Sequence, residues 1–269
     1  MVSQYFYTTN SEKKPQESPV RTWSVKIIIL AITVLILQSA FNFILAPQIL
    51  ITRVLIEGAG TISHEQVMKL AGLKVKEYYF SVDQNGIKDR LENSGLFKTA
   101  DVQKVFPETL KIDLIRRKPV AVSLVPQGKY YLSLELDGEG IVCNILPAGG
   151  VSNLPVLSGV LFQDVKLGMR VPDSLGALMG DLASLQQTSQ TLYLWISEIQ
   201  VHKSRNQSFT MTVYPSVSSL KIRLGDRLDQ RILKEAAVVA DMLRKQGLDF
   251  QVQELDFRTD QIVLSTAED

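Results

Sequence analysis

An uncharged run of 20 residues, from Ile27 to Ala46, constrains this chain more than any other feature of its sequence. Thirteen of the 20 are Ile, Leu, Val or Phe. A helix of about 20 apolar residues spans the hydrocarbon core of a bilayer. Each central aliphatic residue favours insertion by about 0.3–0.6 kcal/mol. We therefore predict a single transmembrane helix over residues 27–46.

The 26 residues before this run distinguish an anchor from a cleaved signal peptide and set the orientation. A signal peptide has an apolar region of about 7–15 residues behind a short basic leader. Here four basic residues precede the longer run, whereas only Arg53 lies between Pro47 and Gln66. The positive-inside rule then leaves the N-terminus in the cytoplasm and places everything from Pro47 on outside. We expect an uncleaved signal anchor behind a flexible cytoplasmic tail, residues 1–26. The Tyr5-Phe6-Tyr7 sequence in this tail is either a short docking motif or part of a tail that binds nothing.

Two polar side chains lie inside the uncharged run. Gln38 and Asn42 are four residues apart, so they share one face of a helix. Either they form a helix–helix contact within the membrane, worth about 0.6 kcal/mol per side-chain hydrogen bond, or they lie near the outer interface and are hydrated. The sequence alone leaves both interpretations open.

The composition excludes several classes of function for the rest of the chain. The net charge is +1, with 29 Lys and Arg against 28 Asp and Glu. A protein that binds nucleic acid through bulk charge needs an excess of basic residues. Cys143 is the one cysteine and there are two histidines, which excludes an intramolecular disulfide and a cysteine metal cluster. We expect no nucleic-acid binding, no metal site and no cofactor.

Residues 47–118 predict a small domain with the order β-α-α-β-β. Ile49–Glu57 has the β-branched composition of a strand. Ser63-His64-Glu65-Gln66 is a capping box that begins a short helix, and Asp83 is expected to cap a second one. Two alternating strands follow, joined by a turn at Phe106-Pro107-Glu108-Thr109.

From Pro119 on, the pattern shifts to short strands and turns, which predicts a β-rich domain over residues 119–269. Two amphipathic helices are expected in it, at Asp173–Gln187 and Leu228–Gln246. Four residues of the second helix should share its core face: Ile232, Ala236, Val239 and Leu243. The expected strands are Val120–Leu124, Lys129–Leu134, Ile141–Asn144, Leu194–Val201, Phe209–Tyr214, Leu220–Leu224, Phe250–Arg258 and Gln261–Ser265.

No catalytic motif stands out in the extracytoplasmic part. A penicillin-binding transpeptidase needs S-x-x-K at the start of a helix, but Ser218-Ser219-Leu220-Lys221 lies on an expected strand. Cys143 has no histidine nearby in sequence and is expected to be a buried structural thiol. His64 is expected to be exposed in the first turn of its helix. We predict that the chain is not an enzyme.

Several short motifs follow the predicted anchor, and their sequences and order resemble those of the bacterial FtsQ/DivIB cell-division family. Arg116 stands where that family often has glutamate, which leaves the local ion pairing open. The motifs are Val54–Gly58, Ile62–Ser63, Ile87–Leu91, Leu96–Val102, Phe106–Ile112, Arg117–Ala121, Asp137–Val142, Leu154–Gly159, Leu224–Gly225 and Leu255–Arg258.

The resemblance implies an α+β fold: a single transmembrane helix, a POTRA domain (β-α-α-β-β) and a C-terminal β-rich domain with two helices. It also implies a non-enzymatic scaffold in the cytoplasmic membrane at the division septum. Such a scaffold binds the membrane-anchored proteins FtsB and FtsL, acts on no small-molecule substrate and helps control septal wall synthesis. The alternatives are a POTRA component of outer-membrane assembly or secretion, and a membrane-anchored cell-wall enzyme.

Partner binding is expected on the last two strands. Because four residues follow Ser265, we expect the final strand to be an uncovered edge that accepts an added strand. The resemblance places FtsB capture here. Arg258 either pairs with a partner carboxylate or bridges to Asp256 and holds the strand in register. The candidate residues are Arg258, Thr259, Gln261, Ile262, Val263 and Leu264.

Overall fold

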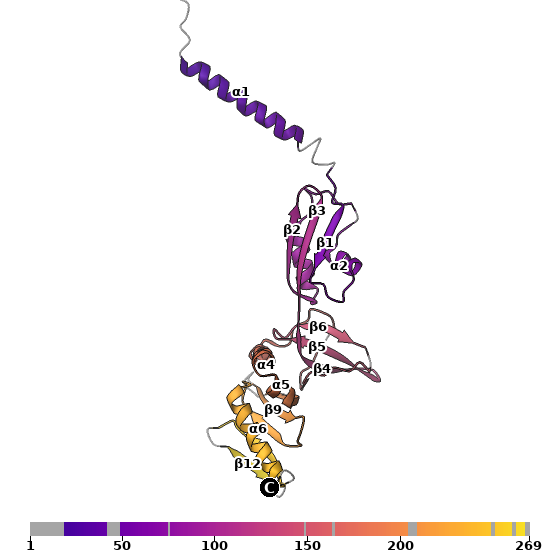
Figure 1. Cartoon of the computed structure of the whole chain (residues 1–269), viewed down its shortest axis with the longest axis vertical. Coiled ribbons are helices and arrows are strands. Elements are labelled where there is room, and N and C mark those ends of the chain that lie inside the picture. Colours follow the sequence, from indigo (N-terminus) through magenta and orange to yellow (C-terminus); the bar gives the residue numbers. More distant parts are fainter. Residues whose placement is uncertain are drawn as a thin grey trace, which may run out of the picture.

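The structure, a computed structural model, forms an elongated molecule in which one helix, a small unit and a larger unit follow one another along the long axis (Figure 1). The buried apolar side chains form two clusters, one within residues 51–114 and the other within residues 120–257. The described residues are 19–41, 49–74, 76–147, 149–162, 165–203, 209–248, 251–259 and 262–266.

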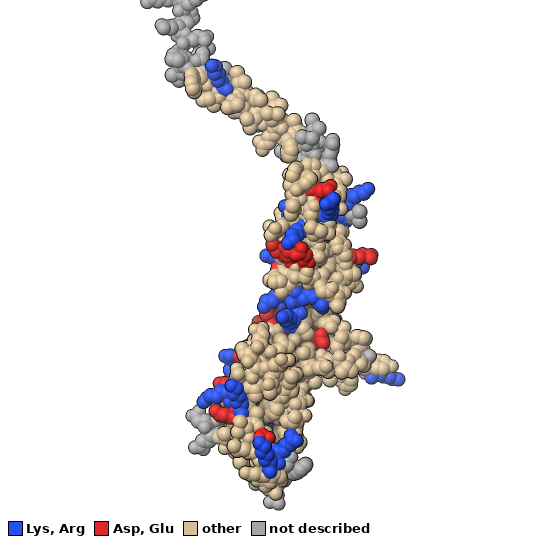
Figure 2. Space-filling view, viewed as in Figure 1, with Lys and Arg blue, Asp and Glu red and all other residues tan. Residues whose placement is uncertain are grey.

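Helix α1 (Pro19–Ala40) contains most of the uncharged run. Its Ile, Leu and Val side chains between Ile27 and Leu37 are 52–65% exposed and point to all sides, and Figure 2 shows basic atoms only toward its start. Among the residues that the structure describes, no helix is long and apolar enough to cross a membrane. Gln38 lies on α1, whereas Asn42 lies outside the described residues.

The first unit has the predicted β-α-α-β-β order. Its sheet has the strand order β1-β3-β2, with β1 parallel and β2 antiparallel to the central β3. Alternation puts Leu110, Ile112 and Leu114 of β3 on the buried face, together with Ile87 and Leu91 from the second helix. The elements are β1 (Arg53–Glu57), α2 (His64–Ala71), α3 (Gln84–Asn93), β2 (Phe97–Val105) and β3 (Thr109–Arg116).

The predicted capping box of α2 is confirmed. The Gln66 amide donates to Ser63 Oγ at 3.2 Å, and the Ser63 amide donates to Gln66 Oε1 at 3.3 Å. The prediction for Asp83 is wrong in its chemistry: Asp83 is the residue before α3, but its side chain makes no capping hydrogen bond. Its carboxylate lies instead over Gly86, with Oδ2 at 2.4 Å from where a Cβ would sit.

The first strand is shorter than predicted because its beginning pairs elsewhere. The Ile51 amide donates to the Glu77 carbonyl, and the Tyr79 amide donates to the Ile49 carbonyl, both at 2.9 Å. Residues 49–51 are thus tied to the segment after α2, and the ladder with β3 begins only at Arg53.

The second unit contains one nine-stranded sheet. Its strand order is β12-β11-β10-β9-β8-β7-β4-β5-β6, so the last strand of the chain is one edge and β6 is the other. The short β7 was not predicted; it pairs in parallel with both β4 and β8 and joins the two halves of the sheet. The strands are β4 (Pro119–Gln127), β5 (Tyr130–Asp137), β6 (Val142–Leu146), β7 (Val156–Ser158), β8 (Ile196–Lys203), β9 (Phe209–Pro215), β10 (Lys221–Leu224), β11 (Val252–Asp256) and β12 (Val263–Thr266).

Three α-helices accompany this sheet, where the sequence predicted two. The extra helix is α5, which occupies the start of the strand expected at Leu194–Val201 and buries Leu192 and Tyr193. It places the Tyr193 hydroxyl 2.9 Å from the Val120 carbonyl, to which it donates. The helical segments are a 3₁₀ turn η3 (Asp173–Leu175), α4 (Gly176–Thr188), α5 (Gln190–Trp195) and α6 (Gln230–Lys245).

The buried face of α6 is centred differently from the prediction. Leu233, Ala236 and Ala240 are its buried residues, whereas Ile232, Val239 and Leu243 are only partly buried. The two alanines mark the line of closest approach because their small side chains let the helix lie near its neighbours. The prediction is thus confirmed for Ala236, and Ile232, Val239 and Leu243 pack against the core beside the buried residues.

The two units meet at a cluster of charged side chains, which we call the junction cluster: Lys98, Arg117, Asp137 and Glu139. Arg117 Nη1 donates to Asp137 Oδ2 at 2.6 Å and to Glu139 Oε2 at 2.8 Å. The Arg117 and Asp137 side chains are only 7% and 5% exposed. Lys98 Nζ of β2 lies 3.1 Å from Glu139 Oε1. These ion pairs join the first unit to the β5–β6 turn of the second (Figure 2).

Two glycines make a second contact between the units. Gly95 has φ +80° and Gly168 has φ +78°, a region that other residues rarely adopt. A Cβ on Gly95 would lie 2.2 Å from the Gly168 amide nitrogen, so the two backbones touch directly. Since only two residues separate β3 from β4, the junction has little freedom to bend.

The junction cluster predicts a large cost for removing Arg117. In Arg117→Ala the Asp137 carboxylate stays buried without its cation, and losing one partner of a buried pair costs about 3–5 kcal/mol. The neighbouring Arg116 is exposed and donates only to Thr61 Oγ1 at 3.3 Å. Arg116→Ala should therefore change the free energy of unfolding by less than about 1 kcal/mol. Urea denaturation of the two variants measures the difference, and equal small losses would contradict the buried role of Arg117.

Candidate partner-binding edge

Strand β12 forms an open edge of the nine-stranded sheet. It pairs antiparallel with β11 on one side, and within the described residues no strand pairs with its other side. Three consecutive apolar residues at its start are exposed: Ile262 at 47%, Val263 at 54% and Leu264 at 51%. An edge of this kind presents unpaired backbone N–H and C=O groups beside apolar side chains.

The register places these side chains on both faces of the sheet. Leu264 lies opposite the fully buried Leu255 and so shares the core face. Val263 lies opposite Asp256 and shares the outer, polar face. Because residues directly opposite each other in an antiparallel pair lie on one face, a strand added to β12 would find apolar contacts on either face.

The Arg258 side chain is hydrogen-bonded to the Asp256 carboxylate, two residues earlier in the chain. Arg258 Nε lies 2.9 and 3.0 Å from the two carboxylate oxygens, and Arg258 Nη2 lies 2.5 Å from Oδ2. The Arg258 amide donates to the same carboxylate at 2.9 Å. These hydrogen bonds from Arg258 hold the pKa of Asp256 below its usual value. The pair favours the register-holding interpretation, although the Arg258 side chain is still 40% exposed.

The other candidates are only partly brought together. Ile262, Val263 and Leu264 form the exposed start of the edge, and Thr259 is exposed in the turn beside Arg258. Gln261 lies outside the described residues. The sequence did not predict the ion pair between neighbouring strands in which Arg223 Nε of β10 lies 3.1 Å from Glu254 Oε2 of β11. The alternation of Lys221 and Arg223 with buried Ile222 was the available signal.

The opposite edge of the same sheet is already occupied. The Val142 amide of β6 donates to the Met169 carbonyl at 2.8 Å, and the Val142 carbonyl accepts from the Gly168 amide at 2.9 Å. Further along, the Asn144 side chain accepts from the Ile145 amide at 3.0 Å. The two edges therefore differ: β6 is contacted at Val142 by residues 168 and 169, whereas among the described residues β12 pairs with β11 alone.

The residues considered for catalysis do not assemble into a site. Burial raises the pKa of the Cys143 thiol to about 12, so it is a poor nucleophile at neutral pH. Ser218 Oγ is buried without a hydrogen-bond partner, whereas Lys221 is exposed on β10. His64 is exposed in the first turn of α2. Across the described ranges, no group of three or more His, Cys, Asp or Glu is placed to hold a metal ion.

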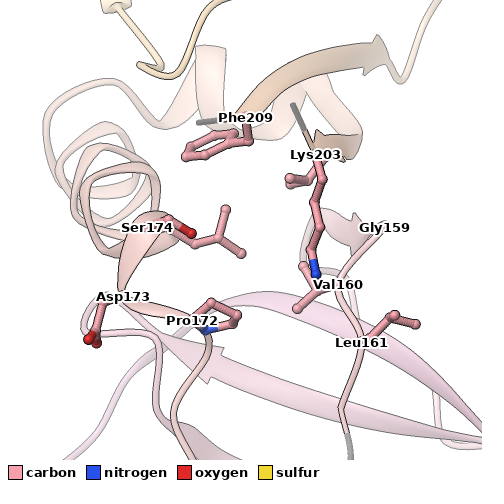
Figure 3. Close-up of a pocket in the computed structure, with 10 residues that line it drawn as sticks. Gly159, Val160, Leu161, Pro172, Asp173, Ser174, Lys203 and Phe209 are labelled. Atoms are coloured by element: carbon pink, nitrogen blue, oxygen red, sulfur yellow. The ribbon is translucent and has the colours of Figure 1, made fainter. Parts of the chain in front are cut away.

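A cavity of about 390 Å³ lies between β8, β9 and the segment that leads into α4. Figure 3 shows Phe209, Pro172 and Val160 around it, with the Lys203 side chain along one side and the Asp173 carboxylate turned away. Among the described residues that line it, Lys203 and Asp173 are the charged ones, and the Asp173 carboxylate points away from the Lys203 ammonium group.

Comparisons with known proteins identify the first unit. The family described as POTRA domain, FtsQ-type, matches residues 50–117. These residues comprise β1, α2, α3, β2 and β3 together with Arg117. The junction cluster therefore includes the last matched residue.

Relatives extend the similarity beyond this domain. A cell division protein FtsQ from Geotalea daltonii is 24% identical over 71% of this chain and 69% of its own length. A cell division protein DivIB from Bacillus cytotoxicus is 28% identical over 76% of this chain and 72% of its own length. The solved major extracytoplasmic domain of DivIB from Geobacillus stearothermophilus aligns with 48% of this chain and 96% of its own, at 18% identity and a TM-score of 0.31. The chain is therefore a relative of the FtsQ/DivIB cell division proteins and carries an FtsQ-type POTRA domain at residues 50–117.

Proposed function

We propose that this protein is a non-enzymatic scaffold of the division septum that captures FtsB and FtsL by strand addition to β12 and so helps control septal wall synthesis. The observation that carries the proposal is the open β12 edge with three consecutive exposed apolar residues. An added strand satisfies the backbone groups of the edge, each net hydrogen bond contributing about 0.5–1.5 kcal/mol. Covering Ile262, Val263 and Leu264 adds apolar burial at about 25 cal/mol per Å².

The asymmetry between the two edges supports the choice of β12. A partner strand needs free N–H and C=O groups, and those of β6 are engaged at Val142 and Ile145. The Asp256–Arg258 pair lies beside Val263, and the carboxylate holds both the amide and the side chain of Arg258. This local order lowers the conformational entropy that binding at the neighbouring edge would cost.

We also propose that residues 27–46 anchor the protein in the cytoplasmic membrane, with residues 1–26 in the cytoplasm. The support is the uncharged run and the apolar side chains exposed all around α1, since a helix that is apolar on all sides needs apolar surroundings. Residues 47–118 and 119–269 would then be the POTRA and C-terminal domains outside. This arrangement brings β12 to partners that are themselves anchored in the same membrane.

Blocking the edge should weaken capture without unfolding the domain. Val263→Lys places a charge on the edge strand β12, a device that keeps natural edges unpaired. Val238→Lys on α6 is the matched control, because both valines are 54% exposed. The affinity of the full chain for the purified FtsB–FtsL complex should fall at least about tenfold, roughly 1.4 kcal/mol, in the first variant only. Equal affinity in the two variants would contradict strand addition at β12.

Arg258→Ala separates an interfacial from a structural role. The pair with Asp256 is partly exposed, and such pairs contribute at most about 1 kcal/mol to stability. We expect the melting temperature to stay close to that of the unmodified chain while FtsB–FtsL capture weakens. If the domain unfolds and binding falls only with the folded fraction, Arg258 is structural.

Replacing Gln38 and Asn42 together by Leu tests the proposed contact within the membrane. The contact is modest, since such hydrogen bonds average about 0.6 kcal/mol, so crosslinking between α1 and other anchored division proteins should decrease several-fold at most. Ser39→Leu, a change at the neighbouring position, serves as the control. Unchanged crosslinking in the double variant would mean that both side chains are hydrated at the interface.

A further inference from the structure

Exposed aromatic side chains gather at one end of the POTRA domain. We call this surface the aromatic pole: Tyr78, Phe80, Val105 and Phe106, arranged over Tyr79. The four outer residues are 52%, 48%, 47% and 67% exposed, whereas Tyr79 is only 7% exposed. The Tyr79 ring lies edge-on to Phe80 at 5.2 Å and to Phe106 at 6.0 Å between centroids. One buried ring therefore holds two exposed rings in fixed positions.

The aromatic pole is the end of the domain that faces α1. The Phe41 ring at the end of α1 lies 6.0 Å from the Phe80 ring, edge to face. The Tyr79 amide donates to the Ile49 carbonyl at 2.9 Å, so the pole is tied to the segment through which the chain enters the domain. Figure 1 shows α1 ending above this end of the domain, with the larger unit at the far end.

Chain length fixes how far the pole can lie from a membrane that holds residues 27–46. Three residues lead from Ala46 to Ile49, and an extended chain covers at most about 3.6 Å per residue. Ile49 is thus within about 11 Å of the end of the apolar run. Each interfacial layer of a bilayer is about 5–8 Å thick. The tether therefore keeps Ile49, whose carbonyl accepts from the Tyr79 amide, at headgroup level or just above it.

We infer that the aromatic pole rests in the lipid headgroup layer, so that the POTRA domain contacts the membrane surface as well as following the anchor. This inference rests on the proposed anchoring of residues 27–46. Tyr side chains concentrate at membrane interfaces because the ring is apolar and its hydroxyl stays hydrated, and Phe side chains add apolar surface that enters the boundary between headgroups and acyl chains.

Charged groups beside the pole suit lipid phosphates. Lys104 Nζ lies 5.8 Å from the Tyr79 ring centroid and 3.5 Å from the Phe80 carbonyl oxygen. The Arg53 side chain is 73% exposed, and its contact with Glu108 is long, at 3.9 Å. Glu108 is the acidic side chain of this contact. Lys104 and Arg53 thus place two cationic groups beside the exposed rings, where they can pair with lipid phosphate groups.

Another exposed aromatic pair shows why position matters. Tyr130 and Tyr131 are 66% and 62% exposed at the β4–β5 hairpin, but this hairpin projects sideways from the second unit, away from α1 (Figure 1). Exposure alone therefore does not distinguish the aromatic pole. What distinguishes it is its connection to the anchor segment through Phe41 and Ile49.

The test is depth-dependent quenching of an environment-sensitive fluorophore on single cysteines in the full chain. Cys143 is buried, and its pKa of about 12 leaves it unreactive at neutral pH. Val105→Cys labels the pole with its aromatic rings intact. Val238→Cys, on the exposed face of α6, is the control, and Leu35→Cys reports the anchor. The probe membranes are phosphatidylcholine–phosphatidylglycerol nanodiscs that carry nitroxides either on the headgroup or on the acyl chain.

We expect headgroup nitroxides to quench the Val105 label at least twofold more than the Val238 label, and Phe80→Ser with Phe106→Ser to remove that excess. Similar quenching at Val105 and Val238, with acyl-chain quenching retained at Leu35, would overturn the inference and leave the anchor standing. Loss of quenching at Leu35 would overturn the anchor and the inference with it. A Val105 label that changes only when FtsB–FtsL is added would assign the pole to a protein partner and overturn the lipid contact.

Discussion

The architecture depends on one buried guanidinium. Arg117 ends the POTRA domain and places Nη1 between Asp137 and Glu139 of the second unit, where its side chain is almost fully buried. Asp137 also accepts hydrogen bonds from the Glu139 and Ile141 amides at 2.9 and 2.8 Å. Backbone amides as well as the arginine therefore hold the carboxylate in place. Hydrogen bonding from Arg117 lowers the pKa of Glu139, which keeps that carboxylate charged at neutral pH. A buried ion pair is weak evidence for stability; here it determines how two cores are oriented.

The two surfaces to which we assign proposed roles lie on either side of this junction. The aromatic pole is at the end of the POTRA domain near α1, and the β12 edge belongs to the far sheet. The aromatic pole consists of exposed rings that pack on the buried Tyr79. The β12 edge presents backbone groups on the side where no described strand pairs with it. Neither requires a reactive side chain. Recognition through geometry and apolar contact is consistent with relatives that are named cell division proteins.

Local signals in the sequence predicted most of the fold. The Ser63–Gln66 capping box, the alternation along β3 and the apolar period of α4 depend on neighbouring residues, and each is present in the structure. The failures involve tertiary contacts. Residues 190–195 form a helix that buries Tyr193, whose hydroxyl donates to the Val120 carbonyl, 73 residues earlier in the chain. On α6, Ala236 is buried as predicted, whereas Leu233 and Ala240, which are also buried, were not among the predicted residues.

The candidate edge was predictable only in part for the same reason. The chain order placed Ile262, Val263 and Leu264 near the end, and the structure shows them exposed on an edge strand. The sequence left two roles open for Arg258 because Asp256 is two residues away in either case. The bidentate geometry shows which pairing exists in the free chain. The engagement of β6 by residues 168–170 is a long-range contact that no local pattern carries.

The two-residue connection between β3 and β4 has a mechanical consequence. A flexible linker absorbs rotation, whereas β3 passes into β4 through Arg117 and Lys118, with Gly95 pressed against Gly168 alongside. Any tilt of the POTRA domain is therefore transmitted to the nine-stranded sheet as the swing of a lever, and the displacement is greatest at the end farthest from α1. A displacement of the nine-stranded sheet would likewise tilt the POTRA domain, because the same two-residue connection joins them.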